Sequence, residues 1–68
     1  MTVAKVIELV GQSNVGWEDA VRNAIKDASK TVDNITGVEV YNLTANVHDG
    51  QIRDYKANIK LAFGVMDR

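Results

Sequence analysis

The chain has 68 residues, a formal net charge of −1 and an apolar content of 46%. A chain this short forms one domain at most, spanning residues 1–68, and small domains often need disulfides, a metal or partner subunits to supplement their core. Because there is no cysteine, disulfides and thiolate metal sites are excluded, which leaves assembly with further copies of the chain as the favoured supplement.

The charged residues argue against nucleic-acid and membrane partners. No two of the eight basic residues are adjacent, whereas nucleic-acid binding needs a concentrated positive surface. No stretch approaches the roughly 18 apolar residues of a membrane span. The N-terminus lacks the basic start and the small-residue cleavage site of a signal peptide. We therefore expect a soluble cytoplasmic protein.

The first two predicted elements are a strand and a helix. Residues 3–11 are rich in Val, Ile and Leu and end at a glycine, which is typical of a strand. Residues 17–32 carry apolar side chains at helical spacing and charged side chains on the opposite face. The N-cap of this helix is expected at Gly16 or Ser13. Trp17 opens the apolar stripe, where a place in the core or an interface is favoured over a role as a stacking platform.

Residues 35–47 and 52–65 predict two strands joined by a hairpin, because an Asp-Gly pair lies between them. In the first of these strands the apolar residues change parity between Val40 and Tyr41, which predicts a bulge. The second strand alternates cleanly, so one face is expected to meet the helix and the other to be polar. We expect Ile25 and Phe63 in the core where the helix meets that strand.

These elements predict an α+β protein with the order β-α-β-β, in which a three-stranded antiparallel sheet is covered by one helix. A single helix covers only part of one sheet face. The outer strands also leave unpaired edges, which invite pairing with another chain. The predicted fold therefore again favours an oligomer.

No catalytic constellation is predicted, and we do not expect an enzyme. His48 and Asp49 fall in the predicted hairpin turn, and Glu18 and Asp19 are the acidic pair expected at a helix start. The glycines match neither a phosphate-binding loop nor a dinucleotide fingerprint. Several residues offer the oxygen ligands that calcium accepts, but their spacing is not that of an EF-hand, and only a symmetric interface would multiply them. These residues are Asp33, Asn34, Asn46, Asp49 and Asp54.

Taken in order, the segments resemble dodecin, a family of very small flavin-binding proteins. The resemblance lies in a G-x-S turn after the first strand, an aromatic opening an alanine-rich helix, the run TVDNI before the next strand, and a Tyr followed by Ala-Phe in the last strand. It implies a sheet wrapped around the helix and a hollow homododecamer. It also implies storage or sequestration of a flavin (riboflavin, FMN or FAD) rather than catalysis, with coenzyme A or calcium bound by some members.

The resemblance also implies a ligand site, and this chain departs from it. The tryptophan that stacks on the flavin in well-studied members corresponds to Gly37. An aromatic that other members carry two residues later corresponds to Glu39, with Val38 between them. A ring-contacting glutamine corresponds to Lys56, and an acidic residue of the middle strand to Asn46.

These departures predict weakened flavin binding, because stacking on an aromatic ring contributes about 0.5–1.5 kcal/mol beyond area burial. Lys56 would favour a phosphate-bearing ligand by its charge, unless it is simply a solvated strand lysine. Two functions stay open. The chain forms a cage that binds a flavin or another phosphate-bearing cofactor, or it forms an assembly that has lost flavin and binds metal or acts structurally.

Overall fold

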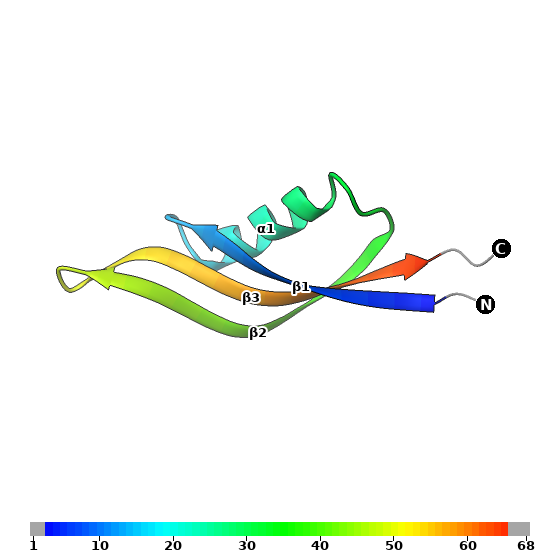
Figure 1. The fold of residues 1–68 in the computed structure, drawn as a ribbon. Coiled ribbons are helices and arrows are strands. Elements are labelled where there is room, and N and C mark those ends of the chain that lie inside the picture. The colour runs from blue at the N-terminus through cyan, green and yellow to red at the C-terminus, as the bar shows by residue number, and fades with distance from the viewer. Residues whose placement is uncertain (1–2, 66–68) are drawn as a thin grey trace.

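The computed structural model describes residues 3–65 and contains one sheet and one helix. The elements are β1 (Val3–Ser13), α1 (Trp17–Ala28), β2 (Ile35–His48) and β3 (Gln51–Val65). The strands are antiparallel in the order β1-β3-β2, so the last strand lies at the centre of the sheet (Figure 1). The predicted β-α-β-β arrangement is confirmed. No helix among the described residues is long and apolar enough to cross a membrane.

The turn before α1 is organised by Ser13, although Ser13 is not the N-cap. The N-cap is Gly16, which has no side chain to cap the helix. The Ser13 hydroxyl accepts a hydrogen bond from the backbone N–H of Val15 at 2.9 Å and donates one to Asp19 Oδ2 at 2.6 Å. Ser13 therefore ties the end of β1 to the first turn of the helix.

The helix is shorter than predicted, because α1 ends at Ala28 rather than at residue 32. The chain then turns, with the N–H of Val32 bonded to the Ala28 carbonyl at 2.9 Å. Thr31 and Val32 are β-branched and favour helix poorly. Ser29 also bonds back to the Ile25 carbonyl through its hydroxyl at 2.7 Å, a contact that competes with the helical backbone.

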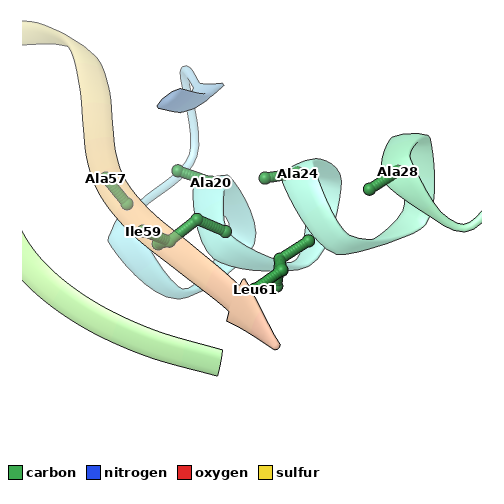
Figure 2. Close-up of a cluster of buried hydrophobic side chains, with 6 residues drawn as sticks. All are labelled: Ala20, Ala24, Ala28, Ala57, Ile59 and Leu61. Atoms are coloured by element: carbon green, nitrogen blue, oxygen red, sulfur yellow. The ribbon is translucent and has the colours of Figure 1, made fainter. Parts of the chain in front are cut away.

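The buried core consists of three helix alanines facing three residues of β3 (Figure 2). Its members are Ala20, Ala24, Ala28, Ala57, Ile59 and Leu61. The expectation that Ile25 and Phe63 form this core is wrong. Ile25 is only partly buried and packs against the flank of the cluster, and Phe63 is half-buried outside it. The alanines take the central place because the helix lies too close to the sheet for larger side chains.

The close approach of α1 to the sheet depends on Gly11, a buried glycine of β1. A Cβ at this position would lie 2.9 Å from the Ala20 carbonyl carbon and 3.0 Å from the Ala24 Cβ, and closer still to the Ala20 carbonyl oxygen. Carbon atoms normally pack at about 3.5–4.0 Å. Only glycine therefore lets the helix backbone rest on β1.

Strand β2 extends beyond the cover of the helix. Helix α1 packs mainly on β1 and β3, so the apolar side chains of β2 on the helix side stay open, with Val40 43% and Leu43 49% exposed. The predicted bulge is confirmed, since the register shifts between Val40 and Asn42 and leaves Tyr41 as the extra residue. The Asp-Gly hairpin is confirmed as well, with positive φ values of 53° at Asp49 and 74° at Gly50.

The molecule is long and flat rather than globular, with principal extents of 54 × 20 × 12 Å. The β2–β3 hairpin projects past the helix at one end, and β1 begins beside the end of β3 at the other (Figure 1). The radius of gyration is 14.0 Å, whereas a compact chain of this length has about 11 Å. One chain alone thus leaves much of its sheet uncovered.

Candidate functional site

An open pocket of about 660 Å³ lies on the sheet face opposite α1 and is the main candidate site. This volume falls within the usual range of small-molecule sites, about 300–1,000 Å³. All three strands contribute to it, and its walls combine small apolar side chains with three charged ones. The lining residues are Val6, Glu8, Gly37, Val38, Glu39, Lys60 and Ala62.

Two neighbouring cross-strand rows build the floor of this pocket. In one row, Ala62 of β3 lies between Val6 of β1 and Gly37 of β2. In the next row, Lys60 lies between Glu8 of β1 and Glu39 of β2. Side chains two residues apart on a strand share a face, so both rows face away from the helix. The pocket is therefore apolar at one end and charged at the other.

Gly37 leaves an open slot at the apolar end of the pocket. A Cβ at this position would meet only the Ala62 Cβ, at an ordinary contact distance of 3.9 Å. Among the glycines of residues 3–65 only Gly50 has a positive φ, so the backbone at Gly37 accepts any L-residue without strain. A glycine inside a strand often marks a place where a ligand or another backbone approaches closely. Gly37 therefore leaves bare strand backbone open to a ligand or to a neighbouring chain.

Lys60 lies at the centre of the charged end of the pocket. Its Nζ lies 3.9 Å from Glu8 Oε1 and 5.3 Å from the centre of the Tyr41 ring. Both charged side chains are well exposed, and ion pairs of this kind contribute little to stability. Sequence reasoning missed Glu8 and Lys60 as site residues. The alternation along the last strand placed Lys60 on a polar face, but only the register brings Lys60 and Glu8 beside Gly37.

The five residues expected at the ligand site fall into two separate places. Gly37, Val38 and Glu39 line the pocket. Lys56 lies on the same strand and face as Ala62 but six residues away, which corresponds to about 20 Å along a strand. Asn46 lies near Lys56 and donates a hydrogen bond from Nδ2 to Asp54 Oδ2 at 3.3 Å. Within one chain, the structure does not bring Asn46 or Lys56 to the pocket.

The remaining polar candidates have structural surroundings. His48 Nε2 lies 3.5 Å from Asp49 Oδ2 at the exposed hairpin tip. Glu18 pairs with Arg22 at 2.9 Å on the outer face of the helix. Within residues 3–65, no group of three or more His, Cys, Asp or Glu side chains is placed to hold a metal ion.

Trp17 serves the fold at the start of the helix. Its indole Nε1 donates a hydrogen bond to the Thr44 carbonyl of β2 at 2.8 Å, and its ring meets Tyr55 of β3 edge to face at 4.9 Å. The side chain thus reaches across the central strand and links α1 to β2. It lies on the helix side of the sheet, away from the pocket.

Comparison with known proteins gives consistent matches. The family model described as Dodecin matches residues 3–66. A dodecin from Thermus thermophilus is 30% identical over 61 residues, which span 90% of this chain and 88% of the relative. The structure of dodecin from Streptomyces coelicolor has a TM-score of 0.93 at 33% identity, covering 98% of this chain and 96% of its own.

A third match is to a protein described as binding calcium. The calcium dodecin of Mycobacterium tuberculosis, described as a calcium-chelating immunodominant antigen with a novel calcium-binding site, is 32% identical to this chain. Its TM-score is 0.79, with 90% of this chain and 87% of its own covered.

Proposed function

Because the chain belongs to the dodecin family, we propose that it is a non-catalytic small-ligand-binding protein that works as a hollow assembly of twelve copies. The ligand is a flavin or a related ring cofactor, held for storage or sequestration. The observation that carries this proposal is the pocket beside Gly37, which opens on the sheet face that the chain's own helix leaves bare.

The surface of the single chain supports assembly. Its accessible area is 5095 Å², whereas a globular protein of 7.5 kDa exposes roughly 4,250 Å². Large apolar side chains are exposed on both outer strands, Val6 and Val10 on β1 and Val40 and Leu43 on β2. The outer edges of β1 and β2 have no strand partner within the described chain. Partner copies would cover these surfaces, as expected for a domain with so small a core.

The pocket supports a ring-shaped ligand bound more weakly than in relatives that carry a stacking tryptophan. Val6 and Ala62 give an apolar surface on this face, and Gly37 offers bare backbone but no aromatic face. Riboflavin, FMN and FAD share the ring that such a slot would take. Coenzyme A lacks that ring, so we rank it after the flavins.

Native mass spectrometry of freshly purified protein tests the proposal, since it reports stoichiometry and bound small molecules together. We expect an assembly of about 90 kDa, twelve chains of 7.5 kDa each. Equilibrium dialysis should show flavin bound with measurable but modest affinity. A stable monomer at micromolar concentration would contradict the assembly. A dodecamer that retains no flavin, even at millimolar concentrations, would contradict the ligand.

The variant Gly37→Trp tests the place of the ligand. The new side chain meets open space and unstrained backbone, so the protein should fold and assemble. Stacking of the indole should tighten riboflavin binding about two- to tenfold and quench flavin fluorescence. Gly37→Leu is the matched control, because it fills the slot without an aromatic face. No gain in either variant would show that the ring does not lie beside residue 37, and equal gains in both would show that the ring does not stack on the side chain there.

Calcium binding is the second candidate function. It is supported by the description of the Mycobacterium tuberculosis relative and by the Asn46–Asp54 pair, whose side-chain oxygens are hard ligands. One such pair is too few for a site, so symmetry-related copies would have to supply the rest. Isothermal titration of the assembly with calcium tests this. If the heat of calcium binding persists in Asp54→Asn, the ion binds at another place.

The other expectations from the sequence stay predictions. These are the single domain over residues 1–68, the cytoplasmic location and the absence of nucleic-acid and membrane partners.

A further inference from the structure

We propose that Glu8 and Glu39 are specificity-determining residues that make the pocket prefer an uncharged ring ligand over its phosphate-bearing counterpart. This inference rests on the proposed function and deepens it, because it names the class of flavin that the site selects. Riboflavin would be the preferred ligand, and FMN or FAD would be disfavoured. The sequence by itself suggested the reverse, a phosphate-bearing ligand attracted by Lys56.

The charge balance of the pocket carries the argument. Two carboxylates, Glu8 and Glu39, flank one ammonium group, Lys60, in a single cross-strand row, which leaves a formal charge of −1. The ammonium group is already engaged, since Lys60 Nζ lies 3.9 Å from Glu8 Oε1 and above the Tyr41 ring. Glu39 on the opposite strand has no ion-pair partner within the described residues. An incoming phosphate therefore meets an uncompensated carboxylate.

The apolar row next to these charges defines what the pocket does accept. Val6, Ala62 and the bare backbone of Gly37 form a flat surface one row away from Lys60. A neutral aromatic heterocycle gains from covering apolar surface there and loses nothing to the carboxylates. A phosphate monoester carries a charge of about −1.5 to −2 at neutral pH. The row beside this apolar surface carries Glu8 and Glu39, so a phosphate that extends from the ring towards that row meets two carboxylates.

Lys56 does not offset this repulsion within the chain. It lies four residues along β3 from Lys60, about 13 Å from the charged row, which exceeds the Debye length of roughly 8 Å at physiological ionic strength. No other charged residue of the described chain lines the pocket. If two copies meet about a two-fold axis at this face, each pocket contributes a formal charge of −1. The combined negative charge then increases the preference for the uncharged ligand over its phosphate-bearing counterpart.

Equilibrium dialysis of the assembled protein against riboflavin and against FMN tests the inference through the ratio of the two dissociation constants. We expect riboflavin to bind more tightly by on the order of tenfold at physiological ionic strength. The ratio should shrink towards one in 1 M salt, where the Debye length falls to about 3 Å. The double variant Glu8→Gln/Glu39→Gln should reverse the preference in favour of FMN, since only the positive charge of Lys60 then remains in the pocket. Lys60→Gln should increase the preference for riboflavin.

Glu18→Gln is the matched control, because it removes the same charge from an exposed position on the far side of the helix and should leave the ratio unchanged. FMN binding as tightly as riboflavin at physiological ionic strength would overturn the inference, as would a ratio insensitive to Glu8 and Glu39. If Lys56→Gln then selectively weakened FMN, the Lys56 of a neighbouring copy would be the phosphate contact. Failure of both flavins to bind would overturn the proposed ligand together with this inference, whereas equal binding of both overturns this inference alone.

Discussion

Replacement of Gly11 by alanine is expected to separate the helix from the sheet. The added Cβ would lie 2.9 Å from the Ala20 carbonyl carbon and 3.0 Å from the Ala24 Cβ. Because carbon atoms pack no closer than about 3.5 Å without strain, α1 must move away by at least about 0.6 Å. The neighbouring atoms belong to backbone and to a rigid methyl group, so no side-chain rotation relieves the clash.

The loss of stability follows from the gaps that this movement opens in the core. Gaps of 0.5–1 Å forfeit about a quarter to a half of each dispersion contact, and overpacked cores typically lose about 1–3 kcal/mol. Alanine also restricts the unfolded chain relative to glycine, which returns about 0.4–1 kcal/mol. The difference leaves a net loss of at most about 2.6 kcal/mol, and we expect Gly11→Ala to lower the free energy of unfolding by about 1–2 kcal/mol.

Urea unfolding at a fixed chain concentration, followed by the fluorescence of Trp17, measures the effect. The chain concentration must be fixed because assembly contributes to apparent stability. Gly64→Ala is the matched control, since a Cβ at that strand position meets no atom within 4 Å, and it should be neutral or slightly stabilising. A Gly11→Ala protein within about 0.5 kcal/mol of the Gly64→Ala protein would show that the helix does not rest on β1 as described.

Three further predictions concern the core, the helix start and the hairpin. Ile59→Ala should lower the free energy of unfolding by about 2–5 kcal/mol because the side chain is fully buried. The same change at the exposed Ile52 should lower it by under about 1 kcal/mol. Equal losses in urea unfolding would contradict the core assignment. Trp17→Phe removes the hydrogen bond to the Thr44 carbonyl and should cost about 0.5–1.5 kcal/mol, with no change in flavin affinity by dialysis. Gly50→Ala places a Cβ at a φ of 74° and should lower the thermal midpoint by a few degrees, an effect of about 1 kcal/mol; an unchanged midpoint would mean that the turn relaxes without strain.

The position of the pocket suggests how ligand binding and assembly are connected. The helix protects one face of the sheet, and the pocket lies on the other face, beside the exposed Val6 of β1. A copy that covers Val6 would also close the pocket. On the proposed function, a ligand bound there would contact more than one copy, and it would stabilise the assembly by an amount that rises with the logarithm of the ligand concentration.

The sequence by itself determined the elements and their order. The alternation along β3 fixed which residues face the helix, the Asp-Gly pair fixed the hairpin, and the change of parity after Val40 located the bulge. These are local signals, since side-chain period and turn geometry depend on residues only a few positions apart. The same local signals overestimated α1, because the apolar spacing continues through Val32 while the chain must already turn back towards the sheet.

Only the tertiary structure decided which residues meet. Strand order and register join Glu8, Lys60 and Glu39, residues more than 20 positions apart in the chain, into one row, and they place Lys56 about 20 Å along β3 from Gly37. The closeness of α1 to β1 likewise placed alanines rather than Ile25 at the centre of the core. Contacts between distant segments depend on how whole elements pack. The sequence around a residue therefore does not show which distant residue it will contact.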